Sequence, residues 1–343
     1  MTIDPEWKEA LPTLAIGAIG AALFWLISFP AAVLTGPAAA VTLATIMGVK
    51  TAIPPRLRDG VFVILGITIG STVTPEVIDT AMTWPLSLLV LSVTLFAALI
   101  LARAALMRVF GFDRMTALMS ATPGHLSYVL SISTDVSADF RRVALVQTVR
   151  VLLLTLLVPV LVSLWGIEGR SRLADHGAIT PLSLTLIFLV AIVLGLLLKR
   201  LKVPAPLLIG AMAVSAISHG TDVTPGTTPA WLTSLAFICM GSLIGSRFRG
   251  FARREFTAAL SAGLVTTLLT CAVAALGALI AARLIGLSPA ALLLAFAPGG
   301  VEVMAALAVE TGLEPALVAA HHVFRLVLLG VFIPVLVMRN RAA

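Results

Sequence analysis

The amino-acid sequence predicts an all-α membrane protein with two inverted repeats, about ten transmembrane helices and two Pro-Gly segments that are broken or re-entrant. Three observations support this prediction. Apolar residues make up 59% and charged residues only 11% of the 343 residues, whereas soluble domains carry about 25% charged residues. Lys and Arg lie in short clusters between long apolar runs, as in cytoplasmic loops, so the net charge of +7 does not indicate nucleic-acid binding. The pattern of the first half returns in the second half.

The first half contains five apolar runs and one Pro-Gly segment. Acidic residues outnumber the single Lys8 before the first run, unlike the basic start of a cleaved signal, so we expect a retained helix there. Lys50, Arg56 and Arg58 place the second loop in the cytoplasm. Gly66 and Gly70 form a G-x-x-x-G face, which suits close helix packing. The runs cover 11–28, 31–49, 60–73, 85–106 and 143–165, and the Pro-Gly segment covers 115–134.

A polar connector at 166–180 precedes a repetition of the same pattern. Landmarks of the first half return after 174 or 175 positions, and a constant offset indicates a duplication. The first membrane repeat therefore covers 1–165 and the second covers 181–343. The matched landmarks are Pro30 with Pro204, Gly66 with Gly241, Gly70 with Gly245, Gly111 with Gly286, Pro123 with Pro298, Arg150 with Arg325 and Pro159 with Pro334.

The basic clusters decide between parallel and inverted repeats. If both Pro-Gly segments cross the membrane, the repeats are parallel, and the clusters at 199–202 and 247–254 face outward. If both segments re-enter, each half has five spans, the repeats are inverted and these clusters face the cytoplasm. The positive-inside rule favours the second arrangement, with both termini in the cytoplasm.

The two Pro-Gly segments predict a binding site. Proline removes a backbone donor, and glycine adopts backbone angles that are costly for other residues. In lipid, broken backbone persists only where it is buried in protein or lines a wet cavity, and one interruption in each half is typical of transporter sites. Two kinked packing helices are the alternative interpretation. The candidate glycines are Gly124, Gly299 and Gly300.

Polar residues inside the apolar runs are the other candidates. Arg150 follows Gln147 by one helical turn, and Arg325 follows His321 and His322 by four and three positions, so each set lies on one helix face. An arginine in an apolar span normally faces a cavity or a partner, although snorkelling from the helix start is the alternative.

The charges near the Pro-Gly segments favour an anionic ligand. Glu302 is the clear intramembrane carboxylate, and Arg325 is its natural counter-ion. Arg150 has the neutral groups of His125, Ser127 and Tyr128 in the equivalent segment instead. Positive charge therefore exceeds negative charge, and exposed backbone donors at the breaks add to this preference.

The sequence resembles the AbrB family of bacterial inner-membrane proteins. The motifs that carry the resemblance are Gly-Phe-Asp-Arg at 111–114, Ala-Thr-Pro-Gly at 121–124, Ala-Phe-Ala-Pro-Gly-Gly at 295–300 and Ala-Ala-His-His at 319–322. The resemblance implies a multi-pass inner-membrane protein, distantly similar to cation antiporters and bile-acid-type symporters. The family carries the labels transcriptional regulator and ammonia monooxygenase. His125 and Ser127 depart from a symmetric pattern with Gly300 and Glu302.

A secondary carrier for a small anionic metabolite, coupled to protons or cations, is our first interpretation. The alternative is a membrane-embedded sensor that acts indirectly on gene expression, since no polar stretch is long enough for a helix-turn-helix. An enzyme that oxidises ammonia needs several metal ligands, and five scattered histidines argue against one. We therefore expect no catalytic activity, metal or cofactor. The expected partners are the lipid bilayer and a small molecule or ion, without direct nucleic-acid contact, and a homodimer stays open.

Histidines near the site predict proton-linked binding. Histidine is the side chain whose ordinary pKa allows a change of charge near pH 7. His125, or the pair of His321 and His322, is the expected proton carrier. An added positive charge strengthens anion binding as the pH falls.

Overall fold

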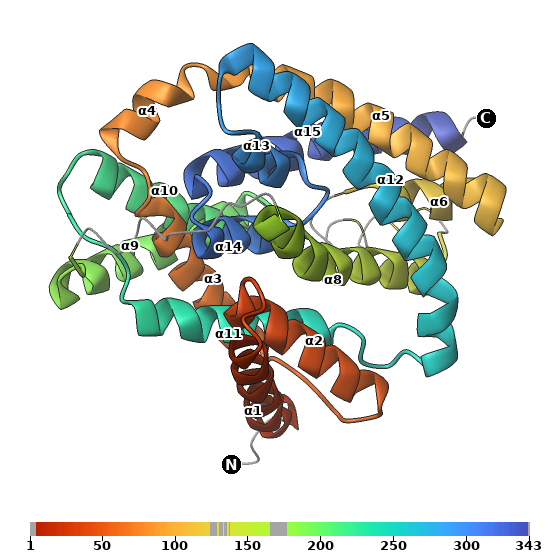
Figure 1. Ribbon diagram of the computed structural model, residues 1–343, viewed down its shortest axis with the longest axis horizontal. Helices are drawn as coiled ribbons and strands as arrows, with labels where there is room; N and C mark the ends of the chain where they lie inside the picture. The colour runs from red at the N-terminus through yellow and green to blue at the C-terminus, as the bar shows by residue number, and fades with distance from the viewer. Residues whose placement is uncertain are drawn as a thin grey trace. The chain divides into compact units, whose positions relative to one another are not determined.

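A computed structural model describes residues 5–123, 129, 133, 136, 138–164 and 177–341, and its regular elements are α-helices (Figure 1). The all-α prediction is confirmed. The helices are α1 (Pro5–Leu26), α2 (Ala32–Ile46), α3 (Pro55–Gly70), α4 (Pro75–Ala81), α5 (Trp84–Phe110), α6 (Arg114–Ala121), α8 (Phe140–Leu164), α9 (Pro181–Arg200), α10 (Pro206–Gly220), α11 (Ala230–Ser246), α12 (Arg253–Ile285), α13 (Pro289–Phe296), α14 (Val301–Thr311) and α15 (Pro315–Arg341).

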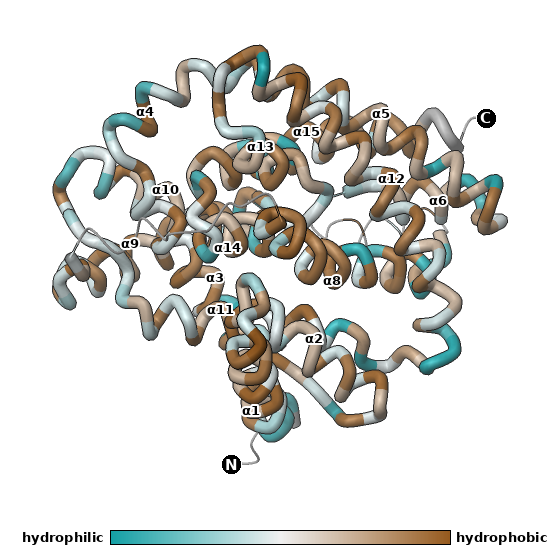
Figure 2. The backbone as a smooth tube through the Cα atoms, in the orientation of Figure 1, coloured by the Kyte–Doolittle hydropathy of each residue, from teal (hydrophilic) through white to brown (hydrophobic). Residues whose placement is uncertain are grey.

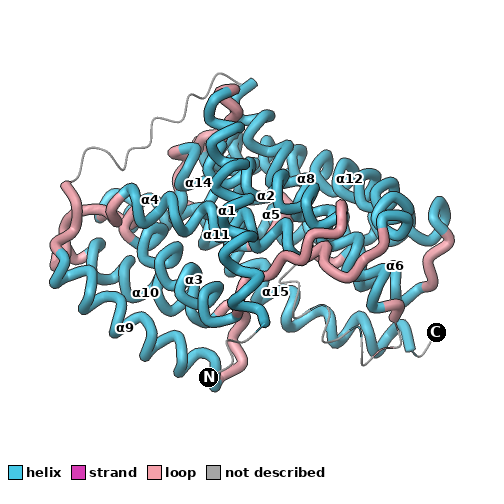
Figure 3. Tube along the Cα trace, turned by 90° about the horizontal axis from the view of Figure 1, so that it is seen from below, coloured by secondary structure: helices cyan, strands magenta, loops and turns pink. Residues whose placement is uncertain are grey.

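Six of the described helices, α1, α5, α8, α9, α12 and α15, are long and apolar enough to cross a membrane. The helices α3 and α4 make a seventh span if the pair, bent by 86°, is counted as one. The remaining three of the ten predicted spans correspond to the shorter apolar helices α2, α10 and α11. The helices consist mainly of hydrophobic residues, and many hydrophilic residues lie at helix ends and in the loops (Figure 2). Most of the chain is helical, with short loops between the helices (Figure 3).

The helix limits follow the offset that the sequence predicted. α2 and α10 begin and end 174 positions apart, and α6 and α13 begin and end 175 positions apart. α8 and α15 also begin 175 positions apart. Equivalent sequences thus form equivalent helices, which supports the duplication.

The chain folds into two compact units, and each unit takes segments from both repeats. Unit 1 consists of Met1–Ala81, Thr155–Phe251 and Ala305–Ala316, and unit 2 consists of Met82–Leu154, Ala252–Met304 and Leu317–Ala343. Repeats and units are therefore two different divisions of the chain.

Glycines bring the helices of the two repeats together inside unit 1. A Cβ atom on Gly66 of α3 would lie 2.5 Å from the carbonyl oxygen of Leu208 in α10. A Cβ atom on Gly241 of α11 would lie 2.3 Å from the carbonyl oxygen of Leu34 in α2. Gly241 and Leu34 are the repeat equivalents of Gly66 and Leu208, so one contact is made twice with the repeats exchanged. The predicted close packing at Gly66 is confirmed.

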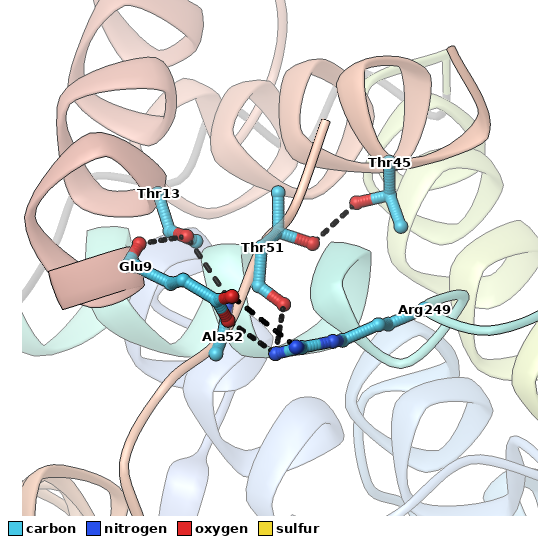
Figure 4. A network of polar contacts seen from close by, with 6 residues as sticks. All are labelled: Glu9, Thr13, Thr45, Thr51, Ala52 and Arg249. Atoms are coloured by element: carbon cyan, nitrogen blue, oxygen red, sulfur yellow. Dashed lines mark hydrogen bonds and ion pairs between the residues drawn. The ribbon is translucent and has the colours of Figure 1, made fainter. Parts of the chain in front are cut away.

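The segments predicted to face the cytoplasm contact one another in unit 1 (Figure 4). Arg249, which follows α11, forms an ion pair with Glu9 of α1 and donates to the carbonyl oxygen of Thr51 at 3.5 Å. The Thr51 hydroxyl lies 2.7 Å from that of Thr45 at the end of α2. The start of α1, the loop after α2 and the cluster after α11 therefore share one end of the unit.

The segments predicted to face outward also contact one another. The backbone N–H of Ile179 donates to Thr227 at 3.0 Å, and the N–H of Thr227 donates to Gly177 at 3.0 Å. A Cβ atom on Gly220 would lie 3.1 Å from the side chain of Ile78 in α4. The contacts between the repeats, Arg249 with Glu9 and Gly220 with Ile78, agree with inverted repeats and disagree with parallel ones. The side of the membrane on which each end lies stays a prediction.

Replacement of Gly66 tests the close packing. Because a Cβ atom would overlap the backbone of α10, Gly66→Ala should lower the free energy of unfolding by about 1–3 kcal/mol. Gly60 lies on the same helix with open space around it. Gly60→Ala should therefore stabilise the protein by about 0.5–1 kcal/mol through helix propensity. Thermal unfolding in detergent, followed by circular dichroism, measures both changes, and equal effects at the two positions would contradict the proposed packing.

Single cysteines test the inverted arrangement. In a background without Cys239 and Cys271, Leu201→Cys lies in the predicted cytoplasmic cluster and Thr221→Cys lies at the predicted outer end. Both side chains are exposed. A membrane-impermeant maleimide should label only Thr221→Cys in intact cells and both variants after lysis. Labelling of Leu201→Cys in intact cells, which parallel repeats require, rules the inverted arrangement out.

Candidate functional site

The candidate site lies in unit 2, where α6 and α13 end. Proline follows both helices, at Pro123 and Pro298, and cannot donate a backbone hydrogen bond. The last regular bonds are donated by the N–H of Thr122 to Leu118 at 3.1 Å and by the N–H of Ala297 to Leu293 at 2.9 Å. Beyond these residues the carbonyl oxygens lack helical partners and need others.

The helix that ends at the first break, α6, lies beside α8. The backbone N–H of Asp139 donates to the Thr116 hydroxyl at 2.8 Å, so the start of α8 lies beside the start of α6. Further along both helices, the Gln147 amide donates to the carbonyl oxygen of Met119 at 2.8 Å. The helices α6 and α8 therefore run in the same direction.

The second break has the same geometry. His322 of α15 contacts the carbonyl oxygen of Leu294 in α13 at 3.0 Å. One turn later Arg325 donates to the carbonyl oxygen of Ala297 at 2.6 Å. The helices α13 and α15 thus also run in the same direction. In each repeat the broken helix is thus parallel to the helix that carries its arginine, which agrees with the re-entrant arrangement that the basic clusters favour.

Arg150 provides the missing hydrogen bonds at the first break. Its guanidinium donates to the carbonyl oxygens of Thr122 at 3.2 Å and Ser120 at 3.4 Å, and to the side-chain oxygen of Gln147. The Gln147 amide also donates to Thr122 at 2.8 Å. Arg150 is only 2% exposed. Its side chain points into the protein and does not snorkel.

Arg325 does the same at the second break. It donates to the carbonyl oxygens of Ala297 and Gly299, and to a ring nitrogen of His322. Arg325 is 1% exposed, and it is among the largest side chains that are fully buried. Snorkelling is therefore excluded here too.

Gln147 and His322 are equivalent positions, 175 residues apart, each three residues before its arginine. Both side chains join a carbonyl oxygen of the broken helix to the guanidinium. The sequence alone did not pair these two residues, although the constant offset of 175 relates their positions. An amide and an imidazole look unrelated until their contacts are compared.

The contacts of His322 determine which of its ring nitrogens carries a hydrogen. Its Nε2 faces the carbonyl oxygen of Leu294, which only accepts, so Nε2 carries hydrogen. Its Nδ1 faces a guanidinium nitrogen of Arg325, which only donates, so Nδ1 is the acceptor. A second proton, on Nδ1, would place an N–H donor of His322 against an N–H donor of Arg325, with a positive charge on each group. His322 is thus held neutral, and of the expected histidine pair only His321 is left as a proton carrier.

The charged groups of the site act on one another. Arg325 interacts electrostatically with Arg150, which repels it, and with Glu302, which attracts it. Glu302 lies in the first turn of α14 and is 3% exposed. The hydrogen bonds of Arg325 described above go to backbone oxygens and to an imidazole, so Glu302 is an electrostatic neighbour of this guanidinium. Two positive groups and one negative group leave a positive surplus.

The two glycines at the second break leave space that neighbouring side chains fill. A Cβ atom on Gly299 would lie 2.7 Å from the side chain of Met304. A Cβ atom on Gly300 would lie 2.9 Å from a carboxylate oxygen of Glu302. Larger residues would therefore displace these side chains.

A small cavity joins the two breaks. Pro123 and Pro298 line it together with Arg325, Thr94 of α5 and Thr270 of α12. Its volume of about 10 Å³ is enough for roughly one water molecule. The remaining lining residues are Leu91, Leu95, Ala98, Ala274 and Phe296. The sequence did not predict Thr94 and Thr270 as site residues, because single hydroxyl groups are common in apolar helices.

Two buried donors of the site lack partners. The Nε atoms of Arg150 and Arg325 have no hydrogen-bond acceptor within the described part of the chain. A buried N–H without an acceptor costs about 1–3 kcal/mol, so such groups indicate a place for water or a ligand.

The structure brings seven predicted residues together, namely Gln147, Arg150, Gly299, Gly300, Glu302, His322 and Arg325. His321 lies on the same helix but contacts Ser87 of α5 at 2.8 Å instead. Four predicted residues, Gly124, His125, Ser127 and Tyr128, lie outside the described residues.

Comparisons with known proteins agree on one family. The family profile described as "Transition state regulatory protein AbrB" matches residues 33–340. The chain is 32% identical to the "Uncharacterized protein YhjN" of Bacillus subtilis (strain 168) over 289 residues, which cover 79% of this chain and 75% of that protein. It is 26% identical to the "Putative regulator AbrB" of Escherichia coli (strain K12) over 313 residues, which cover 88% of each chain.

Exchange of His322 tests its role as a neutral bridge. His322→Leu removes both contacts and leaves Leu294 and Arg325 with buried unpaired groups, so the free energy of unfolding should fall by about 1–3 kcal/mol. His322→Gln copies the arrangement at Gln147 and should cost less than about 1 kcal/mol. Thermal unfolding of both variants in detergent measures the difference. Equal losses for Gln and Leu would show that the bridge is unimportant.

Proposed function

The chain belongs to the AbrB family of membrane proteins, and from this premise we propose that it is a secondary carrier for a small anion. The observation that carries the proposal is a buried arginine at each of two helix breaks, where both breaks and Arg325 line one cavity. We place the protein in the bacterial inner membrane, with both termini in the cytoplasm.

The charge of the site supports an anionic ligand. A buried guanidinium without a fully compensating carboxylate is costly in an apolar environment. Here Glu302 attracts Arg325, while Arg150 repels it. A small anion would offset the surplus charge, and the unsatisfied Nε–H groups of both arginines would supply charge-assisted donors for it.

The duplicated breaks support transport. Inverted repeats with one broken segment in each are typical of carriers that alternate between two openings. Pro123 and Pro298 place one break from each repeat at the same cavity. The small volume of this cavity suits a closed state, and movement of either hairpin would enlarge it on one side.

A membrane-embedded sensor is the second candidate. The description of the family and the name of the Escherichia coli relative both refer to a regulator. A sensor would use the same anion site without carrying the ligand across. It would act on gene expression through another protein, because the sequence has no stretch suited to reading DNA. Both candidates bind and release their ligand without covalent chemistry.

A thermal-shift screen tests the anion site. Purified protein is heated with phosphate, sulfate, acetate or malonate, and with the matching sodium chloride concentration as the control for ionic strength. An anion at 100 times its Kd stabilises the folded state by about 2.7 kcal/mol and raises the midpoint. Arg150→Ala and Arg325→Ala should abolish the shift.

Arg141→Gln is the matched control, because Arg141 has the same charge but lies on the surface, paired with Glu255. It should keep the full shift. If no anion stabilises the wild type, or if the shift survives in both alanine variants, the anion site is wrong. Flux of the stabilising anion into proteoliposomes then separates the carrier from the sensor, since only the carrier accumulates it.

A further inference from the structure

His321 has contacts that differ from those of the neighbouring His322. It is fully buried, with 0% of its side chain exposed. Its Nδ1 lies 2.9 Å from the carbonyl oxygen of Leu317, one turn earlier in α15. Its Nε2 lies 2.8 Å from the Ser87 hydroxyl, which in turn lies 2.8 Å from the carbonyl oxygen of Trp84.

These contacts fit two protonation states with the same heavy-atom positions. Nδ1 faces an acceptor and carries hydrogen in both states. In the neutral state, the Ser87 hydroxyl donates to Nε2. When Nε2 takes a proton, its new N–H donates to the Ser87 oxygen, and the hydroxyl hydrogen turns to the carbonyl oxygen of Trp84. Every hydrogen then has an acceptor, which is not true of His322.

The other repeat shows that the fold does not need this polar pair. The equivalents of His321 and Ser87 at the offset of 175 are Val146 and Ala262. Both are buried, 0% and 1% exposed, and belong to one apolar cluster. The same helix contact is thus apolar in one repeat and carries an imidazole and a hydroxyl in the other. Packing alone does not explain the substitution.

The described contacts of His321 from other helices are made by groups that carry no charge. Ser87 and Trp84 face it from α5, and Phe296 faces it from α13, with ring centroids 6.1 Å apart for both aromatic neighbours. On α15 the charged or titratable neighbours are His322 and Arg325.

Arg325, one turn further along the same helix, connects this pair to the anion site. Glu302 and Arg150 act on Arg325 electrostatically, as described above. A positive charge on His321 would therefore change the electrostatic potential at Arg325 and at the anion site.

The Ser87–His321 pair lies near the start of α5. Ser87 lies three residues after the first residue of α5, and Met82, just before that helix, is 83% exposed. The indole N–H of Trp84 is buried and has no acceptor among the described residues. A water molecule that entered beside Trp84 would satisfy this N–H and reach the Ser87–His321 pair.

We propose that His321 and Ser87 form a proton-binding site of the second repeat. The ligand is a proton from water, which binds Nε2 of His321 while the Ser87 hydroxyl reverses its hydrogen bond. Its use as the coupling proton of an anion carrier rests on the function proposed above, whereas the existence of the site does not. The added positive charge lies one helical turn from Arg325 and would favour an anion there.

Histidine titration in lipid nanodiscs tests the site without any anion. Protein labelled with [15N]histidine is followed by two-bond 1H–15N correlation spectra between pH 4.0 and 8.5, and His321→Gln assigns the signals. His321 should change from a neutral imidazole with hydrogen on Nδ1 to an imidazolium as the pH falls. His322 should keep the neutral form with hydrogen on Nε2 over the whole range.

Ser87→Ala should move the midpoint of the His321 titration to lower pH by about one unit, because the charged form loses its acceptor for Nε2–H. His219→Gln is the control, since His219 is a buried histidine of unit 1 and should not affect His321. A His321 that stays neutral throughout, or a midpoint unchanged by Ser87→Ala, overturns the proposal. These outcomes are independent of the thermal-shift and flux results.

A double variant separates a proton role from a structural one. His321→Val with Ser87→Ala copies the pair found in the first repeat, so it should fold with a nearly unchanged midpoint of thermal unfolding. It should also bind one proton fewer than the wild type on acidification, measured by potentiometric titration. A variant that folds normally and still binds the same number of protons contradicts the proposal.

Discussion

The hydrogen bonds from two buried arginines to broken helix ends hold the functional part of this protein together. Proline ends α6 and α13 inside an apolar unit, where the last carbonyl oxygens have no water to bond. Arg150 and Arg325 reach these oxygens from parallel neighbours, α8 and α15. Because a hairpin brings each break beside its arginine, the re-entrant geometry and the buried charge depend on each other. Neither would be stable in an apolar environment alone.

Because the chain is duplicated, each contact in one repeat can be compared with the equivalent contact in the other. Where both repeats keep the same contact, as with the arginines and the carbonyl oxygens, the contact belongs to the shared fold. Where the repeats differ, the difference needs its own explanation. Gln147 and His322 perform the same bridging task with different chemistry. His321 and Ser87 replace an apolar pair, and this replacement is not required by packing.

The sequence was sufficient for the fold class and indicated the duplication, because composition and spacing control these features directly. The offset of 175 and the Pro-Gly pairs predicted both breaks, and the polar residues inside apolar runs indicated the arginines. The length of the Pro-Gly segments could not separate a crossing segment from a re-entrant one, since about twenty residues suit either, and only the placement of the basic clusters favoured re-entry. Nor did it predict which groups Arg325 would bond, because backbone oxygens are present in every sequence. Thr94, Thr270 and Ser87 were missed for a similar reason, as a single hydroxyl in an apolar helix usually bonds its own backbone.

The exchanged glycine contacts of unit 1 have a consequence for the history of the chain. Gly66 of the first repeat meets α10 of the second, and Gly241 of the second meets α2 of the first. A chain of half this length would leave both faces uncovered, so it would have to associate with another copy inserted upside down. Such an ancestor must have tolerated both orientations in the membrane. Within one chain each half has a single orientation, and equivalent positions can carry different residues, such as Gln147 and His322 beside the two arginines.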